Sequence, residues 1–179
     1  TVPGSKSISQ RALIAAALAD GSSTLLTPLA SEDTAYTSAA LESMGIDINP
    51  AGDIWTVNGT GGRINTPDKE IFLGNNGTAT RFLTSVAALG HGIFTIAGEK
   101  RMEERPIAPL MQALAGWGVD IQSIKGTGCP PLKIVADGIK GGQTILPAGK
   151  SSQYLSSLLL VAPYARQKAI LTVEGDVPS

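Results

Sequence analysis

Small and aliphatic residues recur along the chain in three blocks that share one plan. Each block opens with a glycine-containing turn, continues through Ser or Thr, and then becomes a mainly apolar run; the blocks begin near residues 3, 74 and 149. Side-chain oxygens of Ser and Thr accept the free N–H groups of a first helical turn, so they favour helix starts at these positions. The pattern therefore predicts three equivalent helices.

Strands and two more polar helices are predicted between these blocks. Apolar and β-branched residues favour strands at 23–26, 54–57, 71–73, 93–96, 132–135, 144–146 and 169–173, and the polar helices span about 32–44 and 107–117. Gly45 and Gly118 follow those helices and suit the left-handed position that ends a helix. The predicted fold is α/β, built from a βαβαββ unit of about 73 residues. Two full copies span about 1–73 and 74–147, and 148–179 begin a third, so we expect a single, incomplete domain.

Composition excludes several classes of protein. With 179 residues, 42% of them hydrophobic and 16% charged, the chain can bury a sizeable core and is not intrinsically disordered. A net charge of −1 gives no bulk field for nucleic acid or an anionic membrane, and no apolar run is long enough to span a bilayer. One cysteine and one histidine exclude a disulfide framework, a cysteine-rich zinc site and a multi-histidine metal centre.

The first residue is Thr1 rather than Met, and both ends fall within motifs, so we expect a piece of a longer protein. No targeting segment is visible, which favours the cytoplasm.

The three predicted helix starts favour an anion. Helices in equivalent positions of repeated units run parallel, so their N-termini, each with a partial positive charge, are expected to meet at one face. The starts add hydroxyls, amides and cations: Ser5, Ser7, Thr78, Ser151, Ser152, Asn75, Asn76, Gln153, Lys6, Arg11 and Lys150. Such groups bind phosphate or carboxylate. Plain helix capping with solvated Lys and Arg remains the alternative.

Other polar residues have mainly structural interpretations. The charge run 98–106 is expected to be a solvated loop, although Arg105 could reach the same pocket. The stretch 32–34 is interpreted as a helix cap with acids in its first turn. Cys129 is expected to be a buried thiol, His91 a loop residue, and Trp55 and Trp117 core residues.

Four ordered motifs resemble those of the 5-enolpyruvylshikimate-3-phosphate synthase family. They are Pro3-Gly4-Ser5-Lys6-Ser7 with Arg11, Leu73-Gly74-Asn75-Asn76-Gly77-Thr78, Arg101-Met102-x-x-Arg105-Pro106-Ile107, and Ser151-Ser152-Gln153-Tyr154-Leu155. The resemblance covers essentially the whole chain. It implies an inside-out α/β barrel domain of repeated βαβαββ units, one of two domains that close on the substrates, of which this chain is most of the first.

The resemblance also implies an activity and roles for single residues. The activity is transfer of the enolpyruvyl group from phosphoenolpyruvate to the 5-hydroxyl of shikimate 3-phosphate, in aromatic amino acid biosynthesis, without metal or organic cofactor. The residues matching shikimate 3-phosphate positions are Ser7, Arg11, Ser151, Ser152 and Ser179. Lys6 and Gln153 match positions that touch both substrates; Gly77 and Arg105 match the phosphoenolpyruvate site, where glyphosate also binds, and Asn75 and Thr78 shape its loop.

The family's catalytic carboxylates match nothing in this chain. We therefore expect a monomeric protein whose complementary C-terminal half supplies catalysis, and no activity from this chain alone. Asn76 and Phe82 stand where many members have Ala and Pro, which leaves glyphosate sensitivity open. Two alternatives stay open: a fragment of the sister enzyme that uses UDP-N-acetylglucosamine, which typically has Lys-Asn in place of Lys6-Ser7, and a non-catalytic anion-binding domain.

Overall fold

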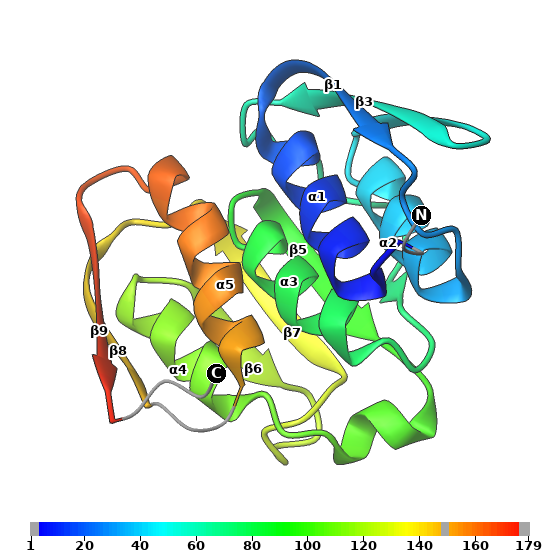
Figure 1. Ribbon diagram of the computed structural model, residues 1–179. Coiled ribbons are helices and arrows are strands. Elements are labelled where there is room, and N and C mark those ends of the chain that lie inside the picture. Colours follow the sequence, from blue (N-terminus) through cyan, green and yellow to red (C-terminus); the bar gives the residue numbers. More distant parts are fainter. Residues whose placement is uncertain (1–3, 148–150, 176–179) are drawn as a thin grey trace.

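Helices and strands alternate along the chain and form an α/β fold with mixed sheets (Figure 1). The structure is a computed structural model that describes residues 4–147 and 151–175. The helices are α1 (Lys6–Leu18), α2 (Glu32–Ser43), α3 (Gly77–Ala87), α4 (Ala108–Gly116) and α5 (Ser152–Val161), with short 3-10 helices at Lys100–Glu104 and Ala162–Tyr164. The strands are β1 (Asp20–Leu26), β2 (Asp47–Ala51), β3 (Ile54–Thr60), β4 (Ile71–Phe72), β5 (His91–Ala97), β6 (Asp120–Ser123), β7 (Leu132–Asp137), β8 (Gly142–Pro147) and β9 (Ala169–Glu174).

The described strands form three sheets. The first has the order β1-β3-β2, with both pairs antiparallel. The second has the order β4-β5-β7-β6, in which β4 and β5 are parallel and the other pairs are antiparallel. The third is the parallel pair β8–β9. The α/β class is confirmed; the inside-out barrel and the division into repeats stay predictions, although β1-β3-β2 and β5-β7-β6 share one order and one set of directions.

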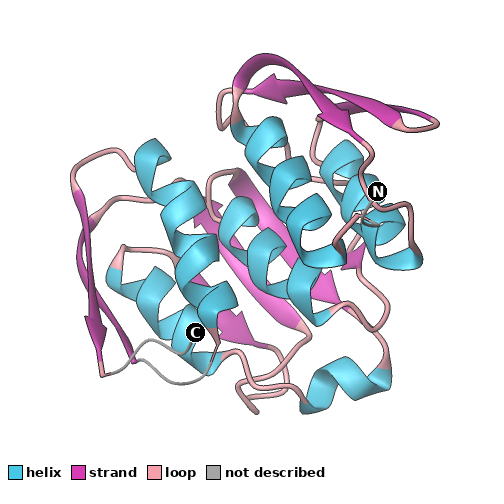
Figure 2. Cartoon of the chain, in the orientation of Figure 1, coloured by secondary structure: helices cyan, strands magenta, loops and turns pink. Residues whose placement is uncertain are grey.

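Helix α3 lies at the centre of the helical layer. It packs against α1 on one side and α5 on the other, in front of β5 and β7 (Figures 1 and 2). Most of its side chains are buried, including two hydroxyls that hydrogen bond: Thr84 Oγ1 donates within α3 to the carbonyl oxygen of Thr80 at 2.6 Å, and Ser85 Oγ donates across to Ser157 Oγ of α5 at 3.1 Å. These short side chains let the helices approach closely while their polar atoms stay satisfied. The start of α3 is thereby held beside the starts of α1 and α5.

Two helices end as their glycines predict. Gly45 after α2 has φ of +92° and Gly118 after α4 has φ of +84°. In each case the next residue donates its N–H five residues back, from Ile46 to Leu41 and from Val119 to Leu114, both at 3.1 Å. This is the hydrogen-bond pattern of a glycine-terminated helix, in which a residue with a Cβ would be strained.

Aromatic residues anchor the core. Trp117, Phe82 and Phe94 are fully buried, and Trp55 of β3 is buried in the same core. Burying one such side chain contributes about 1.5–3 kcal/mol to the free energy of unfolding. The predictions of core positions for Trp55 and Trp117 and of a buried thiol for Cys129 are confirmed.

Three local predictions are wrong. The charge run holds a 3-10 helix rather than only a loop, because Met102 inside it is buried and anchors the turn. His91 begins β5 instead of lying in a loop, and its side chain is exposed. Strands β2 and β6 occupy segments where the sequence indicated only helix ends.

No helix of the described ranges combines the length and the apolar character needed to cross a membrane.

Candidate functional site

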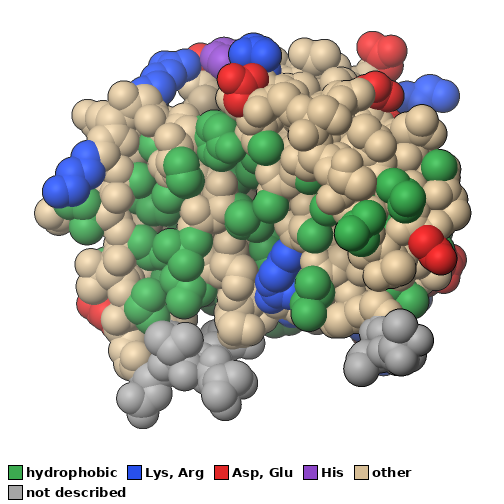
Figure 3. Space-filling view, turned by 45° about the horizontal axis from the view of Figure 1, so that its top comes forward, with side chains coloured by type: hydrophobic (Ala, Val, Ile, Leu, Met, Phe, Trp, Pro, Cys, Tyr) green, Lys and Arg blue, Asp and Glu red, His purple; other side chains and the backbone are tan. Residues whose placement is uncertain are grey.

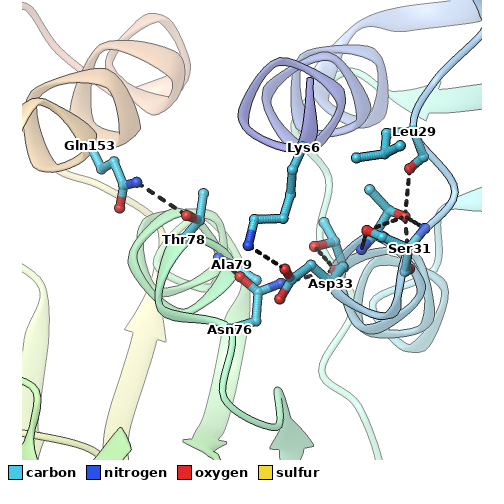
Figure 4. A network of polar contacts seen from close by, with 10 residues as sticks. Lys6, Leu29, Ser31, Asp33, Asn76, Thr78, Ala79 and Gln153 are labelled. Carbon is cyan, nitrogen blue, oxygen red and sulfur yellow. Dashed lines mark hydrogen bonds and ion pairs between the residues drawn. The ribbon is translucent and has the colours of Figure 1, made fainter. Parts of the chain in front are cut away.

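The starts of α1, α3 and α5 and the first turn of α2 surround one polar cavity of about 240 Å³. Figure 4 shows five of its residues, namely Lys6, Asp33, Asn76, Thr78 and Gln153. The lining residues of the cavity are Lys6, Asp33, Asn75, Asn76, Gly77, Thr78, Arg81, Arg105 and Gln153. Three cations and one carboxylate give this wall a net positive charge. Helix N-termini and cations together favour an anion, which is the chemistry predicted from the helix starts.

An ion pair spans two helix starts of the cavity. Lys6 Nζ at the beginning of α1 lies 2.6 Å from Asp33 Oδ2 in the first turn of α2. Half of the Lys6 side chain and a quarter of the Asp33 side chain are exposed. The acid in the first turn suits the helix dipole, and the interpretation of 32–34 as a helix start is confirmed with Ser31 as the cap. Asp33 therefore has a second contact that the sequence did not indicate.

Asn76 joins α3 to α2. Its buried side chain accepts a hydrogen bond from the N–H of Ala79 at 2.9 Å and so caps α3. Its Nδ2 donates to the backbone carbonyl oxygen of Asp33, also at 2.9 Å. Asn76 therefore fixes the spacing between the two helix starts. Alanine could make neither bond.

Arg81 and Gln153 connect α3 to α5. Arg81 Nη1 donates to Gln153 Oε1 at 2.6 Å and to Ser151 Oγ at 3.2 Å. Gln153 Nε2 donates in turn to Thr78 Oγ1 at 3.1 Å (Figure 4). The Arg81 guanidinium also lies over the ring of Tyr154, 5.1 Å from its centroid. Burial raises the pKa of Tyr154, and the charge of Arg81 opposes that rise.

Arg105 approaches the first residue of α3. It follows the 3-10 helix at Lys100–Glu104 and precedes Pro106. A Cβ placed on Gly77 would lie 2.7 Å from Arg105 Nη1, closer than two such atoms can approach. The absence of a side chain at Gly77 therefore lets the guanidinium reach the start of α3.

The structure brings six of the predicted site residues to this cavity and leaves four of the described ones outside its lining. Those that line it are Lys6, Asn75, Gly77, Thr78, Arg105 and Gln153. Ser7 and Arg11 lie together on α1, where Arg11 Nη1 donates to the Ser7 carbonyl oxygen at 3.1 Å and also to its hydroxyl. Ser151 caps α5 and Ser152 is exposed on its first turn. Ser179 and Lys150 lie outside the described residues.

Arg11 instead borders a separate, apolar hollow between α1 and α5. The hollow measures about 480 Å³, and Ile8 and Leu159 on its walls are exposed. Arg11 also lies over the Phe82 ring, 5.0 Å from its centroid. Apolar patches are visible on this side of the molecule (Figure 3).

The sequence missed Asp33 and Arg81 as lining residues, whereas Asn76 was among the polar groups expected at the helix starts. Arg81 could have been found, because it follows Thr78 by one helical turn and so shares its face of α3. The contact of Asp33 with Lys6 joins distant segments and has no local signal. Within the described residues, no group of three or more His, Cys, Asp or Glu side chains gathers as metal ligands would.

An α/β fold that gathers helix starts and cations around one cavity is typical of proteins that act on small anions. Residues 1–179 match the family described as EPSP synthase (3-phosphoshikimate 1-carboxyvinyltransferase). The chain belongs to this family, so the predicted resemblance and the assignment to a transferase family are confirmed.

Curated relatives and solved structures agree with this assignment. A 3-phosphoshikimate 1-carboxyvinyltransferase of Shewanella amazonensis is 47% identical over 182 residues, covering 99% of this chain and 42% of the relative. One of Methanothermobacter thermautotrophicus is 43% identical over 174 residues, covering 97% and 41%. The EPSP synthase structure of Acinetobacter baumannii superposes with a TM-score of 0.89 at 29% identity, covering 100% of this chain and 41% of that one. The chain thus spans about two fifths of the length of these relatives.

Proposed function

We propose that this chain forms one wall of the active site of an enzyme that transfers the enolpyruvyl group of phosphoenolpyruvate to the 5-hydroxyl of shikimate 3-phosphate. In that reaction the hydroxyl oxygen adds to C2 of the enolpyruvyl group and a proton adds to C3; phosphate then leaves C2 and a proton leaves C3. Both substrates and the tetrahedral intermediate between them are anions. The cationic cavity at three helix starts is the observation that supports the proposal.

The cations and the neutral polar residues of the cavity contribute different interactions to binding of the anionic substrates. Lys6 is a point charge at the cavity edge, and Arg105 offers a planar fork suited to a phosphate or carboxylate. Thr78 and Gln153 supply neutral polar groups beside them. Such preorganised donors stabilise charge as it develops during addition. Ser7, Arg11, Ser151, Ser152 and Ser179 belong to the shikimate 3-phosphate half of the site in this proposal.

The chain binds but does not turn over in this proposal, because the family's catalytic carboxylates are expected in the complementary half. Asp33, the carboxylate in the cavity wall, is occupied by Lys6. We expect the chain alone to be inactive and phosphate release to begin when the complementary half is added.

A titration tests whether the chain binds shikimate 3-phosphate, and a reconstitution assay tests whether turnover needs the complementary half. Shikimate 3-phosphate titrated into the ¹⁵N-labelled chain is expected to shift the amides of Ser7, Arg11 and 151–153. Phosphate release is then measured for this chain, for the complementary half, and for their mixture. Turnover by the chain alone would contradict the division of labour; binding without turnover in any mixture would favour the second candidate, a non-catalytic anion-binding domain.

A further inference from the structure

Arg81 sets the direction of a hydrogen-bond chain at the cavity wall. Its guanidinium is a donor only, so every group that it contacts must turn an acceptor toward it. Both of its polar partners, Gln153 Oε1 at 2.6 Å and Ser151 Oγ at 3.2 Å, meet that requirement. An amide side chain has oxygen on one side and nitrogen on the other, and the two look alike in shape. Arg81 therefore decides which way the Gln153 amide faces.

The consequence reaches Thr78. With its oxygen held by Arg81, Gln153 must present its nitrogen to Thr78, and Nε2 donates to Oγ1 at 3.1 Å. The Thr78 hydroxyl then serves as acceptor on that side, so its own proton is free to donate elsewhere. Nε2 carries a second N–H as well. Both groups border the cationic cavity, so each of these two side chains has a donor that it can offer to an anion there.

We propose that Arg81 is a positioning residue that orients the Gln153 amide, so that Gln153 and Thr78 both present donors to an anion in the cavity. The inference rests on the proposed function for the identity of the anion but not for the orientation itself. Without Arg81 the amide could turn over. The Thr78 hydroxyl would then donate its proton to the Gln153 oxygen, and it could no longer donate to an anion in the cavity.

Arg81 is held in place for this role. Its guanidinium lies 5.1 Å from the centroid of the Tyr154 ring, and Tyr154 is fixed by its hydroxyl, which donates to the Pro106 carbonyl oxygen at 2.7 Å. A cation over an aromatic face is attracted to it. Lysine could not replace this arrangement, because one ammonium lacks the planar fork and the flat face of a guanidinium.

The test combines a free-protein measurement with a double-mutant cycle. The variants are Arg81→Met, Arg81→Lys, Gln153→Ala and Arg81→Met with Gln153→Ala. Arg63→Met is the control, because it removes the same charge from an exposed position outside the cavity lining. Melting temperature and the backbone amide spectrum confirm that each variant folds.

In the ligand-free chain, ¹⁵N relaxation of the Gln153 side-chain amide reports its order. We expect a rigid amide in the wild-type chain and in Arg63→Met, and a mobile one in Arg81→Met, with an order parameter below about 0.6. Arg81→Lys should fall between them. An amide equally ordered in Arg81→Met and the wild-type chain would overturn the proposal, whether or not any anion binds.

The affinity for shikimate 3-phosphate then tests the consequence. Arg81→Met is expected to weaken binding about tenfold, the effect of losing roughly one hydrogen bond to a charged group. In the Gln153→Ala background the same substitution should cost less than about twofold, because Arg81 acts through Gln153. Equal losses in both backgrounds would show that Arg81 acts on the anion itself, by its charge or by direct contact, and would overturn the positioning role. If the wild-type chain bound no shikimate 3-phosphate while Arg81→Met freed the amide, the positioning role would stand and the proposed function would fail.

Discussion

Replacing Gly77 with alanine would move a cation without disturbing the fold. The added Cβ would lie 2.7 Å from Arg105 Nη1. Uncharged heavy atoms in contact lie about 3.5–4.0 Å apart, so the guanidinium must withdraw by about 1 Å. Gly77 is the first residue of α3 and does not have a positive φ, so alanine fits its backbone. Helix propensity favours alanine over glycine by up to about 1 kcal/mol.

Gly77→Ala is therefore expected to leave the stability of the chain almost unchanged and to weaken ligand binding. The free energy of unfolding should stay within about 1 kcal/mol of the wild-type value, because a flexible side chain yields to the methyl group. Affinity for phosphoenolpyruvate should fall about tenfold or more, because an error of 1 Å in a bidentate contact removes much of its value. Urea unfolding measures the first quantity and an NMR titration of the chain measures the second.

Arg105→Ala supplies the matched background. If Gly77→Ala acts through Arg105, it should change affinity little once Arg105 is alanine. An equal loss in that background would mean that the methyl group blocks the anion itself. Unchanged affinity in the single variant, or a loss of stability above about 2 kcal/mol, would refute the reasoning from the distance.

Three further predictions follow from single contacts. Asn76→Ala removes the cap of α3 and the bond to Asp33, so urea unfolding should show a loss of about 1–2 kcal/mol; a neutral result would mean that water replaces both bonds. Burial raises the pKa of Tyr154 and Arg81 opposes that rise, so Arg81→Met should raise this pKa further, as measured by an absorbance titration of the tyrosine. The stability linked to Tyr154 is fully present below the ordinary pKa of 10.0 and is lost as pH rises through the raised pKa. Arg166 donates to Asp137 and holds its pKa below the ordinary 3.8, so Arg166→Gln should move the NMR titration midpoint of Asp137 upward; in the wild-type chain the linked stability is present above the unfolded pKa and is lost as pH falls through the lowered one.

Local signals in the sequence predicted most elements well. The glycines after α2 and α4 ended both helices as expected, since a left-handed position has few other occupants. Strands β2 and β6 were missed for an equally local reason. They are short, and β2 contains Pro50, which is tolerated because β2 is at an edge of its sheet. The buried position of Met102 was not predicted, because charged residues surround it in the sequence. Its burial anchors the 3-10 helix that precedes Arg105.

The candidate site was predictable at each helix start but not between them. Lys6, Thr78 and Gln153 stand at turns that any reader of helix starts would select. Their contact partners could not be predicted in the same way, because Asp33 reaches Lys6, and Arg81 reaches Gln153, from a different helix. Arg81 had a periodic signal on α3, whereas Asp33 was already explained by its place in a first helical turn. The helix-start role of Asp33 was enough to explain its place in the sequence, so its contact with Lys6 was not expected.

The composition of α3 links the core to the cavity. Thr84 and Ser85 are small and their hydroxyls are hydrogen bonded, so α3 can lie close to both neighbours. Thr84 bonds within α3, and Ser85 bonds directly to Ser157 of α5. That spacing at the middle of the helices sets the spacing at their starts, where a hydrogen bond of 2.6 Å must bridge Arg81 and Gln153. A bulkier residue at Ser85 would push α5 away and lengthen that bridge before it touched any anion. The geometry of the cavity is therefore fixed by hydroxyl packing one to two turns below the helix starts, as much as by the charged residues that line it.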